Sequence, residues 1–139
     1  MLETLLSPTV SAQLLTLAIL AILFLQSGLD KVVDFKGNLA WLQGHFAKSP
    51  LAGQVTPMLA VITLTETAAG ALAAIGAVML VVDGSTTIGL YACQLCALNT
   101  VMLFFGQRLA KDYAGAASLV PYFILSAGAI LLMLSLIHI

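Results

Sequence analysis

The stretch ITLTETAAGALAAIG, Ile62–Gly76, decides the fold, because it places one glutamate in a long run that holds no other charged residue. It belongs to a chain of 139 residues in which 61 % are hydrophobic and 8 % are charged. Soluble domains carry about 25 % charged residues, so this composition excludes that class. With a mean hydropathy of +1.10, we expect an integral membrane protein that has the lipid bilayer as its partner and binds no nucleic acid.

Four apolar runs can be drawn, over about residues 8–29, 57–82, 86–105 and 116–137. Each is close to the ~20 residues that a helix needs to cross roughly 30 Å of hydrocarbon. The sequence therefore predicts an all-α protein, a four-helix membrane bundle that forms one domain over residues 1–139. The first run follows an acidic start and is too long for a cleavable signal, so we expect it to be a permanent span.

The basic residues predict the topology. Lys31, Lys36 and Lys48 lie between the first two spans, and Arg108 and Lys111 lie between the last two. Loops rich in lysine and arginine stay in the cytoplasm, and an even number of crossings places both termini on one side. We therefore expect a multi-pass protein of the cytoplasmic (inner) membrane of a prokaryote, with the N- and C-termini outside.

A short amphipathic helix is expected between the first two spans, over about residues 38–47. Apolar side chains recur there at three- and four-residue steps, which is typical of a helix lying in the headgroup layer. Trp41 is the expected interfacial anchor. We expect Gly37 to separate this helix from the first span.

Three prolines mark helix boundaries. Ser7–Pro8 and Thr56–Pro57 each combine a capping hydroxyl with a proline at the first helical position, so both predict the start of a span. Pro121 lies about one turn inside the fourth span and predicts an irregular first turn or a kink there.

Glu66 shares its helical face with small residues. At 3.6 residues per turn, one face of the second span carries Glu66, Gly70, Ala73 and Ala77, and the opposite face carries Leu64, Leu72, Ile75 and Met79. Small residues let helices approach closely in lipid, so the glutamate should point into the bundle. A carboxylate there costs about 3 kcal/mol on the insertion scale. Two hypotheses stay open: a role in proton or ligand handling or in an ion pair that shapes a site, or a neutral glutamate that only fixes helix register.

Polar residues of the other spans lie at similar or shallower depths. We predict a buried polar pocket in the cytoplasmic half of the bundle, formed by Gln26, Ser27, Glu66, Asn99, Gln107, Arg108 and Tyr122. Whether Lys31 or Arg108 reaches Glu66 stays open at this stage, because both lie near the membrane boundary.

Cys93 and Cys96, in YACQLCALN, form a C-x-x-C pair. One hypothesis is a redox pair facing a quinone, and the other is ordinary packing of small apolar residues. Residues three apart in a continuous helix do not easily reach disulfide geometry, which favours packing. We expect no metal site, and we expect His45 to be a solvated surface residue. The final LSLIHI, residues 134–139, resembles the translation of a transposon-end adapter, so His138 is assigned no role.

The chain resembles the DoxX family of small prokaryotic membrane proteins over nearly its whole length. The resemblance rests on FLQSGLDKVVDFKG, ETAAGALAAIG and GQRLAKDYAGAASL. The matching positions are Ser27, Gly28, Lys31, Glu66, Gly70, Gly106, Gln107, Arg108, Asp112, Tyr113 and Gly115. Relatives include DoxD-type subunits of a thiosulfate:quinone oxidoreductase and MauE-type proteins of methylamine utilisation. The resemblance implies a four-helix membrane bundle, and the cysteine pair is not part of its pattern.

These observations lead to one leading functional hypothesis and two alternatives. The chain is expected to be a non-catalytic subunit or accessory factor of a membrane redox system, with no activity of its own and with a redox enzyme or a second copy as partner. No cofactor is predicted, although a quinone headgroup would suit the pocket. The alternatives are a small proton-coupled transporter that uses Glu66, and a thiol–quinone oxidoreductase that uses Cys93 and Cys96.

Overall fold

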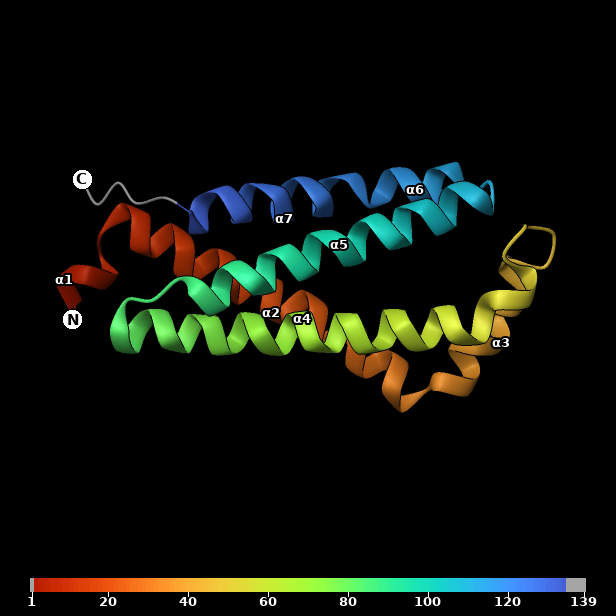
Figure 1. The fold of residues 1–139 in the computed structure, drawn as a ribbon, viewed down its shortest axis with the longest axis horizontal. Coiled ribbons are helices and arrows are strands. Elements are labelled where there is room, and N and C mark those ends of the chain that lie inside the picture. The colour runs from red at the N-terminus through yellow and green to blue at the C-terminus, as the bar shows by residue number, and fades with distance from the viewer. Residues whose placement is uncertain (1, 135–139) are drawn as a thin grey trace.

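The computed structural model describes residues 2–134, which are almost entirely helical and contain no strand (Figure 1). The elements in chain order are α1 (Leu2–Leu5), α2 (Pro8–Val33), α3 (Phe35–His45), the 3₁₀ helix η1 (Ala52–Gln54), α4 (Val55–Asp83), α5 (Thr87–Leu109), α6 (Tyr113–Ser118) and α7 (Val120–Met133). Four helical segments are long and apolar enough to cross a membrane: α2, η1 with α4, α5, and α6 with α7. The predicted all-α class and the four spans are confirmed.

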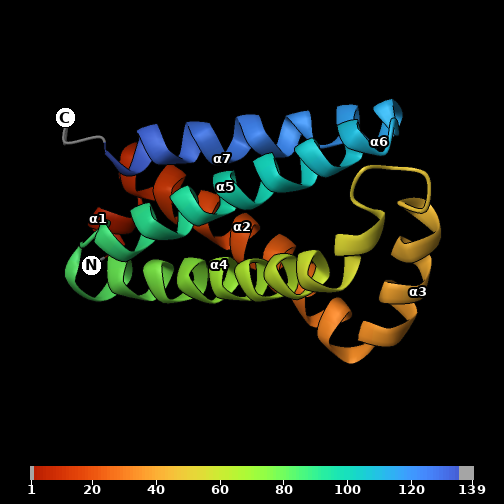
Figure 2. The same ribbon diagram turned by 45° about the vertical axis from the view of Figure 1, so that its right-hand side comes forward.

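The long helices form an antiparallel bundle in which α4 packs between α2 and α5, and α7 packs on the far side of α5 (Figures 1 and 2). Helix α3 turns away from the end of α2 and lies across one end of the bundle (Figure 2). We call this end, which also carries the α5–α6 turn, the basic end, because all five lysine and arginine residues lie on α3, its neighbouring segments and that turn. The opposite end carries α1 and the α4–α5 turn.

The predicted boundaries are correct at two of the marked prolines. Ser7 caps α2 by accepting a hydrogen bond from the Val10 amide at 3.4 Å, and Pro8 occupies the first turn. The fourth span is interrupted at Leu119, just before Pro121, so the predicted irregular turn is confirmed as a break between α6 and α7. The predicted end of this span, near residue 137, lies outside the described residues.

Two other boundaries were predicted wrongly. Helix α4 begins at Val55 rather than at a Thr56 cap, because the 3₁₀ turn η1 leads directly into it. The break between α2 and α3 falls at Asp34 and not at Gly37. The Asp34 carboxylate caps α3 by accepting from the Gly37 amide at 3.2 Å, so α3 starts at Phe35 and ends at His45 instead of covering 38–47.

The small-residue face of α4 allows close contact with both neighbours. A Cβ on Gly70 would lie 2.5 Å from the Leu25 backbone nitrogen of α2, and one on Gly76 would lie 2.7 Å from the Gly89 backbone of α5. On the other face, Leu64 is 71 % exposed. The prediction that Glu66 points inward with the small residues is therefore confirmed, because close packing of this kind needs a face without large side chains.

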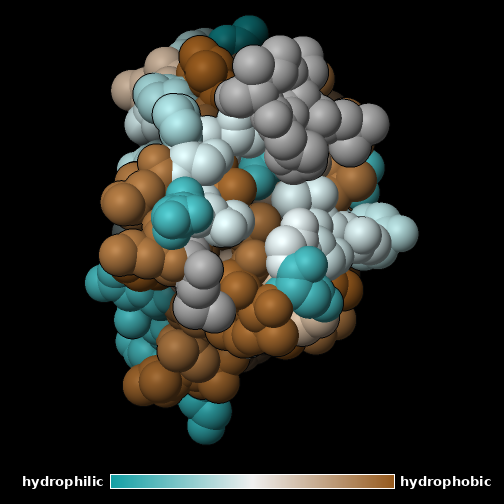
Figure 3. Space-filling view, turned by 90° about the vertical axis from the view of Figure 1, so that its left-hand side faces the viewer, coloured by the Kyte–Doolittle hydropathy of each residue, from teal (hydrophilic) through white to brown (hydrophobic). Residues whose placement is uncertain are grey.

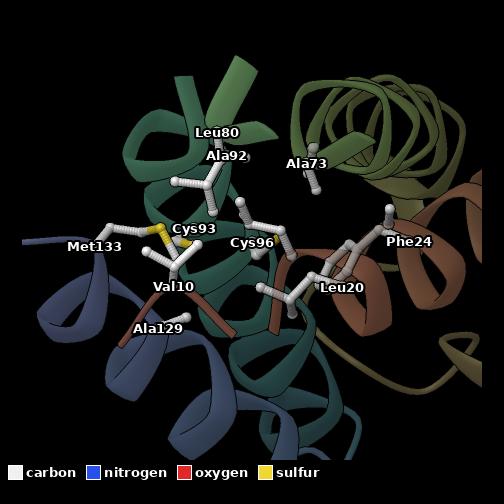
Figure 4. Close-up of a cluster of buried hydrophobic side chains, with 13 residues drawn as sticks. Val10, Leu20, Phe24, Ala73, Leu80, Ala92, Cys93, Cys96, Ala129 and Met133 are labelled. Carbon is white, nitrogen blue, oxygen red and sulfur yellow. The ribbon is translucent and has the colours of Figure 1, made fainter. Parts of the chain in front are cut away.

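The apolar core fills the half of the bundle away from α3. Its members come from α2, α4, α5 and α7, and Val10, Leu20, Phe24, Cys96 and Met133 are among them (Figure 4). Figure 3 looks onto the end that carries α1 and the α4–α5 turn, and it shows pale, weakly polar residues and scattered hydrophilic patches among hydrophobic side chains. The basic half is packed differently, because polar groups and a cavity replace this core there.

Candidate functional site

An ion pair joins α2 to α4 inside the bundle. The Lys31 Nζ lies 3.2 Å from the Glu66 Oε2 and donates a second hydrogen bond, of 2.9 Å, to the Ser27 Oγ. Ser27 and Lys31 are four residues apart, so they share one face of α2. The Glu66 side chain is 2 % exposed and that of Lys31 is 21 % exposed. The open question of reach is answered: Lys31 extends from the last turns of α2 to the carboxylate.

A second polar contact joins α4 to α5 at the neighbouring position. The Asn99 Nδ2 donates to the Thr65 Oγ1 at 2.6 Å, and both residues lie beside the Glu66 level of the bundle. Three buried oxygen atoms nearby have no hydrogen-bond partner: the Glu66 Oε1, the Thr67 Oγ1 and the Asn99 Oδ1. This layer thus leaves two carbonyl-type acceptors and one hydroxyl without partners, which is an expensive arrangement in a low-dielectric interior.

A cavity of about 540 Å³ opens next to the ion pair, at the basic end. Its walls come from the first turns of α4, the last turns of α5, α6 and the inner face of α3, and Phe46, Val55, Ile62, Met102 and Leu119 are among its apolar lining residues. It is open to the surface of the bundle. Its volume falls within the roughly 300–1,000 Å³ of small-molecule pockets.

The end of α2 explains why this cavity exists. Helix α2 stops at Val33 and the chain turns into α3, while α4 begins about three turns beyond the level of Glu66. The first turns of α4 therefore extend past the end of α2. Helix α3 covers only part of the surface of α4 that α2 leaves open there. From α2, Lys31 is the residue that lines the cavity, and it is the one charged residue among the described lining residues.

The C-terminal end of α3 is fixed to the α5–α6 turn by His45. The His45 Nε2 lies 2.7 Å from the Gln107 Oε1 and 3.6 Å from the Asp112 Oδ2. The ring stacks on Trp41 at 4.7 Å between centroids and meets the edge of Phe46 at 5.0 Å. The expectation that His45 is solvated was wrong, because its side chain is only 17 % exposed and is held by residues 62 or more positions away.

The predicted polar pocket is only partly assembled. Ser27 and Glu66 meet through Lys31, Asn99 lies in the adjoining layer, and Gln107 lines the cavity while it holds His45. The prediction was wrong for Gln26, Arg108 and Tyr122, which are exposed. Arg108 lies over the Tyr113 ring at 4.5 Å, outside the bundle, which is a favourable contact for a cation at the interface.

Several further positions of the sequence pattern have structural roles. Gly28 packs against Thr67, Gly106 faces the Phe46 ring, and the Asp112 carboxylate caps α6 by accepting from the Gly115 amide at 2.9 Å. Asp112 therefore uses one oxygen for the cap and turns the other toward His45. These contacts position the walls of the cavity.

The two cysteines lie in the apolar core and away from the cavity. Both are free thiols with 0 % exposure, surrounded by Val10, Leu20 and Met133 (Figure 4). This environment is that of packing residues. Within residues 2–134 no group of three or more histidine, cysteine or carboxylate side chains is arranged to hold a metal ion.

Comparison with protein-family models, with curated proteins and with solved structures finds no match to this chain.

Proposed function

We propose that this chain is a DoxX-like, non-catalytic subunit or accessory factor of a redox system in the cytoplasmic membrane of a prokaryote, and that its cavity positions a lipid or quinone headgroup for a partner enzyme. The observation that carries the proposal is the open apolar cavity that has Lys31, the partner of the buried Glu66, in its lining. Such a site combines apolar walls with a few placed polar groups, which is the usual form of a ligand pocket.

The chemistry of the site supports binding over catalysis. Glu66 is held by Lys31, and the cysteines are fully buried in a different part of the bundle. Near the cavity, the Ser27 hydroxyl lies 2.9 Å from the Lys31 Nζ, but that ammonium donates to Ser27 and to Glu66, whereas acyl or group transfer would need it as a base. A small membrane protein that binds an amphiphile in this way is suited to assisting another enzyme.

Purification of the tagged chain from its native membranes in digitonin tests this proposal, followed by mass spectrometry of whatever is retained. We expect a redox enzyme or its membrane anchor to co-purify. Ile62→Trp, which fills the cavity, should reduce the retained partner or its activity, while the matched variant Leu64→Trp, on the lipid-facing side of α4, should not. A chain that is always recovered alone would count against an accessory role.

A second candidate function is a small proton-coupled transporter. It is supported by the buried Glu66 carboxylate, whose Oε1 has no hydrogen-bond partner, because carboxylates inside the membrane commonly mark proton or substrate pathways. Four spans would then require a dimer to enclose a path. Glu66→Gln that leaves substrate accumulation in proteoliposomes unchanged for every compound tested would exclude this candidate. The thiol–quinone hypothesis, by contrast, has no contact in its favour among the described residues.

A further inference from the structure

We infer that the cavity selects an uncharged amphiphile that carries a carbonyl oxygen, drawn from the surrounding bilayer, and that the Lys31 ammonium donates to that oxygen. This inference rests on the proposed binding role of the cavity and names the class of molecule that the site accepts. It is carried by the charge balance and the donor inventory of the lining residues.

The charge at the site is already balanced. The Lys31 Nζ lies 3.2 Å from a carboxylate whose side chain is 2 % exposed. An anionic headgroup would have to share the ammonium with Glu66 and would bring a second negative charge beside it. A cationic headgroup would meet the ammonium itself. Burying either uncompensated charge is strongly unfavourable, so both classes are excluded in favour of an uncharged head.

Beside the ion pair, the polar atoms that Lys31 and Gln107 leave for a ligand are donors, while Gln54, which also lines the cavity, carries both a donor and an acceptor. An ammonium has three N–H groups, and those of Lys31 go to the Glu66 Oε2, to the Ser27 Oγ and, at a long 3.5 Å, to the Ser27 carbonyl. The weakly used third N–H is therefore available to an acceptor in the cavity. Gln107 gives its Oε1 to His45, so the atom that it can offer to a ligand is its Nε2, also a donor. A carbonyl oxygen is the matching group.

The apolar lining supplies the second half of the recognition. Met58, Ile62, Met102, Leu103 and Leu119 are among the apolar residues that line the cavity, and methionine side chains adapt to flexible chains. The cavity is open to the surface of the bundle, which gives a bilayer molecule a way in. An acyl or prenyl chain fits this lining, and the carbonyl near its head lies toward Lys31.

Native mass spectrometry of the purified chain tests this with four matched probes of one chain length. The probes are 1-monoolein, its ether analogue without the carbonyl, oleate and oleylamine. We expect one monoolein per chain, bound at least about tenfold more tightly than oleate or oleylamine, and about tenfold more tightly than the ether analogue, as loss of a hydrogen bond to a charged donor implies. Equal binding of oleate or of the ether analogue would overturn the inference.

Two pairs of variants distinguish lipid bound in the cavity from lipid bound on the detergent-covered surface of the bundle. Ile62→Trp should reduce monoolein binding at least about tenfold, while Leu64→Trp, two residues along α4 on the exposed face, should change it less than about twofold. Met102→Trp with its exposed control Leu98→Trp repeats the test from α5 if the first variant does not fold. Unchanged binding in a folded cavity variant would overturn the inference. If monoolein does not bind as expected but a redox enzyme still co-purifies, the inference about the ligand fails and the accessory role stands.

Discussion

Removing one member of the Lys31–Glu66 pair should be far more costly than removing the other. In Lys31→Met the Glu66 carboxylate, 2 % exposed, loses the donor to its Oε2, and its Oε1 already has none. Breaking a buried pair in this way costs about 3–5 kcal/mol. In Glu66→Gln, Lys31 keeps the Ser27 hydroxyl and is 21 % exposed, so it can reach toward the interface. We expect this variant to cost about 1–2 kcal/mol.

The double variant Lys31→Met/Glu66→Gln removes the charge of both partners. Replacing a buried pair by neutral groups of similar volume is often close to neutral. We therefore expect the double variant to be more stable than Lys31→Met alone, with a coupling free energy of at least about 2 kcal/mol between the two positions.

Reversible unfolding in mixed dodecylmaltoside–SDS micelles, followed by far-UV circular dichroism, measures these free energies. Lys36→Met on α3 serves as the control, because Lys36 is exposed and should change stability by less than about 0.5 kcal/mol. The reasoning is refuted if the two single variants cost the same, or if their effects add within about 0.5 kcal/mol in the double variant.

Three further predictions concern packing, thiols and α3. Gly70→Ala should destabilise the protein by about 2 kcal/mol, because the new methyl group meets the α2 backbone, while Gly128→Ala, which faces open space, should cost nothing; thermal unfolding in detergent compares them. Cys93 and Cys96 should resist maleimide in intact membranes and react after denaturation, as shown by mass, because both are fully buried. His45→Ala should raise hydrogen exchange in α3 about tenfold, because it removes the contacts to the α5–α6 turn.

Each of these has a result that would contradict it. Equal melting temperatures for the two glycine variants would mean that α2 and α4 are not in close contact at Gly70. Rapid labelling of Cys93 in folded protein would reopen the redox hypothesis. Unchanged exchange in His45→Ala, with the exposed Gln43→Ala as control, would show that α3 is held by its apolar face alone.

The sequence was sufficient for the spans and for the inward direction of Glu66, because hydrophobic length and the spacing of small residues are properties of one helix. Ser7–Pro8 and Pro121 also acted locally and were placed correctly. Such predictions need no knowledge of neighbouring helices.

The composition of the pocket could not be predicted in the same way. Whether Gln26 or Tyr122 points inward depends on how each helix is rotated against its neighbours, and both turn out to be exposed. The His45 contacts join α3 to residues more than sixty positions away, and the one local signal was Trp41 a helical turn earlier. The end of α2 at Asp34, which creates the cavity, could not be seen in the sequence. The helical pattern runs on through Asp34, and Gly37 was the nearest residue that breaks helices.

The lengths of α4 and α5 bear on where the cavity meets the membrane. Helix α4 has 29 residues and α5 has 23, so at 1.5 Å per residue they are about 44 Å and 35 Å long. At the end with the α4–α5 turn, α4 extends beyond the start of α5 (Figure 1). Both exceed roughly 30 Å of hydrocarbon. A thicker bilayer would therefore draw the cavity deeper among the acyl chains, which makes its occupancy sensitive to membrane thickness.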